Sequence, residues 1–224
     1  DVLGSRGLGD VYKRQILCVL VYSALFAQSN EDKKTVFQLS FVPPLSTNGV
    51  YSHQYTNTVS LNLLVGISRN EEAFTWGGIS NIILNDAKGF QMAGLSNYVG
   101  NDGQGVQSAG LANINKNKFS GFQMAGLANT ASAMTGFQFA GLVNIAKEVN
   151  GLQVAGLVNI AKEVNGVQFA GLVNIADKSD CPIGLINIIK NGEMGVAVTY
   201  DALGSTVATF RSGGRYTYGI IGVG

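Results

Sequence analysis

A nine-residue unit repeats along the middle of the chain and constrains the fold more than any other feature of the sequence. Its consensus is G-[FVL]-Q-x-A-G-L-x-N, and copies begin at residues 89, 105, 121, 136, 151 and 166, with degenerate copies at 74–81 and 181–187. Successive repeat centres are 16, 16, 16, 15, 15, 15 and 13 residues apart. A period this regular indicates one structural unit per repeat. The glycines at the repeat centres are Gly78, Gly94, Gly110, Gly126, Gly141, Gly156, Gly171 and Gly184.

The hydrophobic pattern inside one repeat is typical of a β-strand. In 136–146 (GFQFAGLVNIA) alternate residues from Phe137 to Ile145 are apolar or small, and the residues between them form a mixed face that carries Gln138, Leu142 and Asn144. A period of two predicts a strand, and a central glycine in every copy disfavours a helix. The polar connector 147–150 (KEVN) has the composition of a turn.

Two all-β architectures accept such a unit. The layout is nearly symmetric about its centre, because reflection about Gly141 places Gln138 opposite Asn144 and Phe139 opposite Val143. Antiparallel neighbours would then pair apolar with apolar and amide with amide. We therefore predict antiparallel up-and-down strands of 15–16-residue repeats, resembling an incomplete outer-membrane β-barrel. The alternative is a parallel β-solenoid, in which identical residues stack in columns.

The membrane interpretation follows from strand length and from the two faces. Ten residues match the roughly nine to eleven of a tilted membrane strand. The Phe/Val/Ile face suits lipid and the Gln/Asn face suits a lumen. Further strands are expected outside the repeats, at 35–42, 59–68, 195–200, 205–210 and 216–223.

Composition excludes several classes of protein. Of the 224 residues 46% are hydrophobic and 13% are charged, and the net charge is +1. So small a charge gives no basic field for nucleic acid. The mean hydropathy of +0.20 argues against disorder.

The N-terminal segment is expected to consist of a translated adapter followed by a secretory signal; the alternatives are a genuine basic N-terminus and a buried strand or helix at 16–27. Residues 5–15 (SRGLGDVYKRQ) match the translation of a sequencing-library adapter, so 1–15 are set aside as an artefact. Residues 16–27 (ILCVLVYSALFA) form an uncharged run that is too short to cross a bilayer as a helix and has the length of a signal-peptide core. Its removal would discard Cys18 and leave Cys181 alone, which excludes an internal disulfide.

The remaining chain divides into three regions. N-terminal strands are expected at 28–73, the repeat region with eight copies at 74–190, and C-terminal strands that are cut short at 191–224.

The repeat units, together with 182–193 (PIGLINIIKNGE) and 210–215 (FRSGGR), resemble the surface-repeat-containing proteins of Gram-negative bacteria. The similarity covers residues 36–224. It implies an exported, outer-membrane-associated protein and brings no catalytic residues. Longer members of that family continue with further strands, so the resemblance leaves the closure of a barrel in doubt.

Residues with catalytic or ligand-binding chemistry are few. His53 is the only histidine, so it has no second histidine to share a metal, and Cys181 has no histidine nearby in the sequence. The glycine-rich 100–105 lacks a following Lys-Ser/Thr, and Asn101 with Asp102 supplies too few oxygens for Ca²⁺. Arg211 and Arg215 bracket a predicted hairpin turn. We therefore expect no enzyme activity, no cofactor and no metal.

The only set of polar side chains that recurs in every full repeat consists of one Gln and one Asn. They form either a self-satisfied hydrogen-bonded ladder or a polar wall for sugars and other neutral solutes, and the first interpretation is favoured. These positions are Gln91, Gln107, Gln123, Gln138, Gln153 and Gln168, with Asn97, Asn113, Asn129, Asn144, Asn159 and Asn174.

The sequence thus predicts a non-enzymatic repeat protein of the outer membrane or cell surface of a Gram-negative bacterium. Its main form would be a structural or porin-like barrel with the lipid bilayer as partner. The alternative is a surface-exposed β-solenoid that binds a protein or glycan. No nucleic-acid partner is expected.

Overall fold

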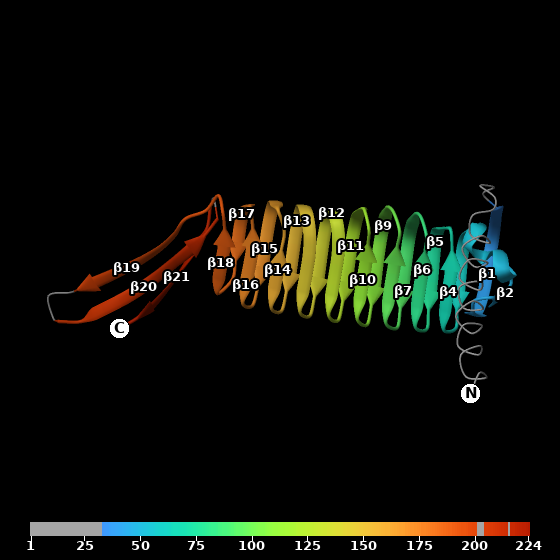
Figure 1. The fold of residues 1–224 in the computed structure, drawn as a ribbon, viewed down its shortest axis with the longest axis horizontal. Helices are drawn as coiled ribbons and strands as arrows, with labels where there is room; N and C mark the ends of the chain where they lie inside the picture. The colour runs from blue at the N-terminus through green and yellow to red at the C-terminus, as the bar shows by residue number, and fades with distance from the viewer. Residues whose placement is uncertain (1–32, 201–203, 215) are drawn as a thin grey trace, which may run out of the picture. The chain divides into compact units, whose positions relative to one another are not determined.

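The computed structural model describes residues 33–200, 204–214 and 216–224, and the part from Lys34 to Gly224 forms one compact unit. The predicted adapter (1–15) and signal segment (16–27) lie outside the described residues. Regular structure in the described part consists of 21 strands and one short 3-10 helix, η1 (Gly49–Gln54) (Figure 1).

The repeats form one uninterrupted stack of parallel coils, a β-solenoid of about nine turns. Each coil contributes a longer strand and a shorter strand, and every strand pairs in parallel with its equivalent one repeat later. The longer strands are β3 (Tyr55–Asn62), β5 (Asn70–Gly77), β7 (Ala87–Ala93), β9 (Gly103–Ala109), β11 (Lys118–Ala125), β15 (Glu163–Ala170) and β17 (Lys178–Ile183). The shorter strands are β4 (Val65–Ser68), β6 (Ser80–Ile83), β8 (Ser96–Val99), β10 (Ala112–Asn115), β14 (Val158–Ile160), β16 (Val173–Ala176) and β18 (Ile186–Ile189). In β12 (Ala128–Ala140) and β13 (Val143–Ala155) a short strand runs on into the next long one.

The pairing register is that of stacked identical residues. Between β11 and β12 Gly121 lies beside Gly136 and Gln123 beside Gln138, and the same offset of one repeat continues through β13 and β15. The predicted antiparallel barrel is therefore wrong, and the parallel solenoid is the architecture of the repeat region. Two further predictions are wrong. The ten-residue strand is broken in its middle, at Gly141 and Leu142, and the predicted turn at 147–150 is part of strand β13.

The break explains the near-symmetric layout of the repeat. Gly141 and Leu142 lie in a turn between β12 and β13, so residues on either side of Gly141 belong to two strands that face each other within the coil. The Nδ2 atom of Asn144 lies 3.5 Å from the backbone oxygen of Gln138, its mirror partner. Symmetry about the centre therefore reflects two strands meeting across an interior, and not two neighbouring copies running in opposite directions.

Close stacking of the turns requires glycine at the repeat centre. A Cβ atom placed on Gly156 would lie 2.1 Å from the backbone oxygen of Gly141 in the preceding coil. A real Cβ atom cannot approach an oxygen that closely, so any other residue would push the coils apart. Gly78, Gly94, Gly110, Gly126, Gly141 and Gly171 meet a backbone oxygen of the preceding coil at a similar distance.

The interior of the solenoid holds buried amides and two apolar clusters that extend over several coils. Gln and Asn side chains occupy the middle of the coil and are fully buried. The larger cluster runs from Phe119 to Ile189, with Met134 and Val149 among its members. A smaller one consists of Ile83, Ala87 and Val99.

Both ends of the solenoid carry different structure. At the N-terminal end β1 (Lys33–Val42) pairs antiparallel with β2 (Leu45–Ser46). At the C-terminal end β19 (Met194–Tyr200), β20 (Thr206–Gly213) and β21 (Tyr218–Val223) form a separate three-stranded antiparallel sheet. Residues of this sheet contact the last coil, where the backbone N–H of Asn187 donates to Ser212 Oγ over 3.1 Å.

Candidate interaction surface

Two ladders of amides run through the interior along the stacking direction. In the first, Gln107 Nε2 donates to Gln91 Oε1 over 2.6 Å, and the same bond repeats in every coil to Gln168. In the second, Asn144 Nδ2 donates to Asn159 Oδ1 over 3.0 Å, and this pattern runs from Asn62 to Asn187. The Gln ladder donates toward the N-terminal end and the Asn ladder toward the C-terminal end, so their dipoles oppose each other.

The Asn side chains also bind across the interior. Asn144 Nδ2 donates its other hydrogen to the backbone oxygen of Val154, at 2.7 Å, and Asn97 to Asn174 repeat this contact. All twelve repeat amides have an exposed fraction of 0%. They therefore present no polar wall to a solute, and their contacts hold consecutive coils in register.

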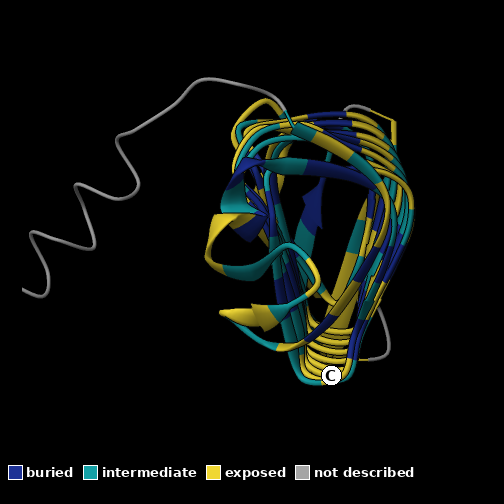
Figure 2. Cartoon of the chain, turned by 90° about the vertical axis from the view of Figure 1, so that its right-hand side faces the viewer, coloured by how far each residue is buried: buried dark blue, intermediate teal, exposed yellow. Residues whose placement is uncertain are grey.

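The outer surface of the solenoid is dominated by one continuous apolar edge. It consists of the residue that follows each repeat-centre glycine, and we call it the Leu ridge: Ile79, Leu95, Leu111, Leu127, Leu142, Leu157, Leu172 and Leu185. Each of these side chains is 38–53% exposed. Figure 2 shows exposed residues gathered in the turns at the narrow end of the coil cross-section.

Apolar columns cover both flanks of the Leu ridge. On the long-strand flank Phe137 and Phe169 are about half exposed, and the rings of Phe122 and Phe139 stack with centroids 5.3 Å apart. On the short-strand flank Ile145 and its equivalents in the later coils are also exposed: Ile160, Ile175 and Ile188.

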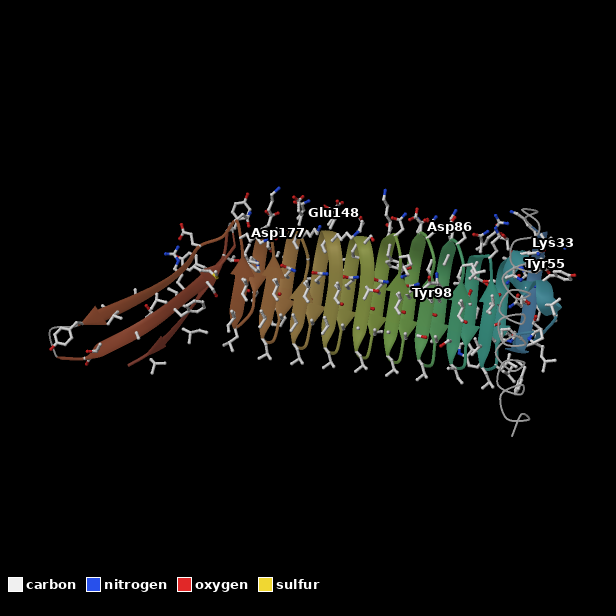
Figure 3. The ribbon with its side chains drawn as sticks, in the orientation of Figure 1. Lys33, Tyr55, Asp86, Tyr98, Glu148 and Asp177 are labelled. Atoms are coloured by element: carbon white, nitrogen blue, oxygen red, sulfur yellow. The ribbon has the colours of Figure 1, made fainter. Side chains whose placement is uncertain are left out.

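Charged side chains lie along the opposite edge of the solenoid, as Figure 3 shows for Asp86, Glu148 and Asp177. Ion pairs join neighbouring coils there, with Lys178 Nζ 2.7 Å from Glu163 Oε1 and Lys190 Nζ 2.6 Å from Asp177 Oδ1. The hydrogen bond from Lys190 lowers the pKa of Asp177, and the bond to Glu163 raises the pKa of Lys178. Pairs this exposed contribute little stability, but they keep the edge close to neutral.

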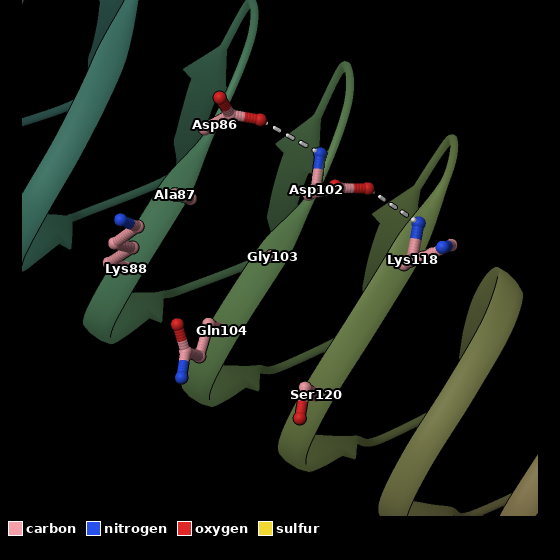
Figure 4. A pocket seen from close by; sticks show the side chains of 8 residues that line it. All are labelled: Asp86, Ala87, Lys88, Asp102, Gly103, Gln104, Lys118 and Ser120. Carbon is pink, nitrogen blue, oxygen red and sulfur yellow. Dashed lines mark hydrogen bonds between the residues drawn. The ribbon is translucent and has the colours of Figure 1, made fainter.

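A shallow hollow of about 410 Å³ lies on the charged edge, lined by Asp86, Lys88, Asp102, Gln104, Lys118 and Ser120 (Figure 4). Its carboxylates are already engaged. Asp86 Oδ1 accepts from the backbone N–H of Asp102, and Asp102 Oδ1 from that of Lys118, both over 3.1 Å. Asn101 Nδ2 also donates to Asp86 Oδ1 over 2.8 Å. The hollow is therefore a by-product of turns that cap one another.

The other candidate residues do not come together. His53 lies in η1 with Nδ1 3.1 Å from the backbone oxygen of Val50, and Cys181 is half-buried with Thr217 Oγ1 3.6 Å from its Sγ atom. Arg211 binds Glu193 over 2.6 Å and lies 3.9 Å from the ring centre of Tyr218. Arg215 lies outside the described residues.

Two other features are absent from residues 33–200, 204–214 and 216–224. No cluster of three or more His, Cys, Asp or Glu side chains there has the geometry of a metal site. In that same part, no helix combines the length and the apolar character needed to cross a membrane.

A scan against protein-family models finds no match, and searches of curated proteins and of solved structures find none either. The surface geometry therefore has to carry any proposal on function.

Sequence reasoning missed the Leu ridge, although the signal was present. On a regular strand Leu142 would share the face of Gln138 and Asn144, which are buried. The position of Leu142 on the same face as two amides indicated that the alternation of inward and outward side chains is interrupted at Gly141. Because Gly141 and Leu142 form a turn, the side chain of Leu142 lies on the outer surface of the solenoid.

Proposed function

We propose that the chain is a non-enzymatic, exported surface protein whose solenoid is a scaffold that binds a component of the Gram-negative cell envelope through its apolar outer surface. The observation that carries the proposal is the Leu ridge, which exposes eight aliphatic side chains in consecutive coils. Exposed apolar patches of this extent mark interaction sites on soluble proteins. Export is supported by the apolar run at 16–27 and by the resemblance to surface-repeat proteins.

The chemistry of the surface favours a hydrophobic partner over a glycan. Sugars are recognised by hydrogen-bonding groups beside aromatic rings, whereas the Leu ridge is aliphatic. The exposed ring of Phe137 on its flank lies beside Phe122 and Leu152 of the neighbouring coils, which offer no hydrogen-bonding side chain. The amides that could have bound sugars are buried and occupied by one another. A scaffold that adheres through apolar contacts fits both facts.

Fractionation of a Gram-negative host tests this function. The full chain, exported behind a standard secretory signal, is expected in the envelope fraction. The triple variant Leu127→Gln, Leu142→Gln, Leu157→Gln is expected to shift into the soluble periplasmic or medium fraction. A matched variant of the charged edge, Lys147→Gln, Lys162→Gln, Lys178→Gln, should stay with the envelope. Recovery of the unaltered chain as a soluble protein would contradict the proposal.

A further inference from the structure

We propose that the partner of the apolar surface is a lipid bilayer, which the Leu ridge enters edge-on while the charged edge remains in water. This inference rests on the proposed function and names the partner of that same surface. Three features of the solenoid carry it: the hydrogen bonding of the ridge turns, the convex shape of the ridge, and the position of the charges.

The ridge turns carry their backbone donors already paired, which burial in hydrocarbon requires. At the turn after β13 the N–H groups of Gly156, Leu157 and Val158 donate to backbone oxygens of the preceding coil over 3.1, 3.1 and 2.9 Å. The turns at Gly94, Gly110, Gly126, Gly141 and Gly171 repeat this pattern. An unpaired N–H would make entry into lipid costly. Ordinary loop tips leave such donors to water, whereas these turns bind one another.

The shape of the apolar surface favours a fluid partner. The ridge lies at the narrow, convex end of the coil cross-section (Figure 2). Exposed apolar side chains continue from it onto both flanks, with Phe137 on one side and Ile145 on the other. A second copy or a flat protein surface would cover one flank, or meet the ridge along a line. Acyl chains can surround a wedge on both sides. The coils stack side by side along one axis (Figure 1), so eight of them about 4.8 Å apart give the ridge a length of roughly 34 Å.

The positions of the charges set how deep the wedge can enter. Residues 136–146, 151–161 and 166–176 contain no charged side chain, and the first charges after the ridge are in the connectors, at Lys147, Lys162 and Asp177. Lys147 is five positions after Leu142 in the sequence, which corresponds to roughly 17 Å of extended chain. That is about half of the ~30 Å hydrocarbon core. The wedge therefore reaches into one leaflet and does not span.

The charged edge carries nearly equal numbers of acidic and basic side chains, so it should not be attracted to anionic lipids. Lys147 is followed by Glu148 and Lys162 by Glu163, and Lys178 pairs with Glu163 of the preceding coil. Binding should therefore depend on apolar contact and change little with salt or with lipid charge.

Flotation with vesicles of pure phosphatidylcholine tests the inference. The full chain is expected to float with the vesicles at both low and high NaCl. The ridge variant Leu127→Gln, Leu142→Gln, Leu157→Gln should lower the partition coefficient by roughly tenfold or more, since three exposed aliphatic side chains lose their transfer into hydrocarbon. The edge variant Lys147→Gln, Lys162→Gln, Lys178→Gln should bind within about twofold of the unaltered chain. All three proteins share residues 1–32, so a contribution of that segment is common to them.

Tryptophan fluorescence reports the orientation. Trp76 is the only tryptophan, so Trp76→Phe gives a background without signal. In that background Leu142→Trp should be quenched by phosphatidylcholine brominated on its acyl chains, and Lys147→Trp should not. Equal quenching at both positions would contradict edge-on entry. Circular dichroism and thermal unfolding test whether each variant is folded. We expect all of them to fold, because the substituted side chains are exposed.

Three further outcomes would overturn the lipid proposal. The ridge variant could float as well as the unaltered chain, or flotation could disappear in high salt. The unaltered chain could instead form ridge-dependent dimers and not float, which would identify a second copy as the occupant. If the chain fails to float but stays with the host envelope, only the lipid inference fails. If it leaves the envelope as well, the scaffold function fails with it.

Discussion

At the scale of single residues, buried polar groups replace much of the usual apolar core. A buried amide is costly unless each of its hydrogen-bonding groups is paired. Stacking identical amides meets this condition because each Gln both donates and accepts along the ladder. The condition fails only where the ladder ends: Gln91 Nε2 and Gln168 Oε1 are buried without a partner, next to Thr75 and Pro182.

A substitution inside the ladder should therefore cost more than one at its end. Gln138→Leu leaves Gln123 Oε1 without its donor and Gln153 Nε2 without its acceptor. We expect the free energy of unfolding to fall by about 2–5 kcal/mol. Gln168→Leu is the matched control, because it breaks one ladder bond and removes an unpaired oxygen. Urea unfolding measures both, and equal losses would show that the ladder does not act as a chain of bonds.

Among the described residues, Glu71 is the one buried carboxyl whose pKa departs from its usual value. Burial raises its pKa, although Asn57 Nδ2 and Ser60 Oγ donate to it over 3.0 and 2.8 Å. In the next coil the residue that pairs with Glu71 in the strand ladder is Ala87, so the buried carboxyl is not repeated there. Between the usual and the raised pKa, the folded chain holds a proton that the unfolded chain has lost.

Stability should therefore fall as pH rises from about 4.5 through the raised pKa and then level off, with a slope of at most about 1.4 kcal/mol per pH unit. Glu71→Gln cannot lose a proton and should remove this part of the pH dependence. The neighbouring exposed residue supplies the control, since Glu72→Gln should leave the dependence in place. Urea midpoints between pH 4 and pH 8 measure all three proteins. Parallel curves for Glu71→Gln and the unaltered chain would contradict the assignment.

At the scale of elements, the period and the strand content could be predicted and the direction of pairing could not. The alternation around Gln138 and Asn144 is the same whether neighbours run parallel or antiparallel, because both arrangements place amide beside amide. Pairing direction depends on whether Gly141 and Leu142 continue the strand or turn it, and one exposed leucine is a weak local signal. The outer columns could be predicted, since Phe137 and Phe139 point outward in either fold.

A second glycine position, the first residue of the repeat, has a positive φ in the six repeats from Gly89 to Gly166. Gly151 has a φ of 141°, and a Cβ atom there would lie 2.1 Å from the backbone oxygen of Gly136. Gly151→Ala should lower the free energy of unfolding by more than about 3 kcal/mol, because strain and a backbone clash add. Gly195→Ala is the control: nothing lies within 4 Å of its Cβ position, so its effect should stay within about 1 kcal/mol. Thermal unfolding compares the two, and a stable Gly151→Ala variant would contradict the close stacking of the long strands at this position.

At the scale of the whole molecule, each coil contacts the coils before and after it. Stability in such arrays is approximately a sum over units and their interfaces. The segment GLVNIAKEVNG occurs at 141–151 and again at 156–166, so adjacent coils here are interchangeable in sequence. The same property allows the Leu ridge to be lengthened or shortened by whole coils without changing its chemistry.

Removal of one complete coil should therefore be tolerated. Deletion of residues 151–165 joins Asn150 to Gly166 and restores the same sequence pattern, so the Gln and Asn ladders and the ridge close again with one member fewer. We expect a cooperative unfolding transition, with stability reduced by one unit and its interface, and circular dichroism of the same shape. Deletion of 151–158 is the contrasting variant. It removes a long strand with Gln153 and the ridge residue Leu157, which leaves Gln138 and Gln168 without their common partner. That protein should unfold far more readily, and if the two deletions proved equally stable, the coil would not be the structural unit of this chain.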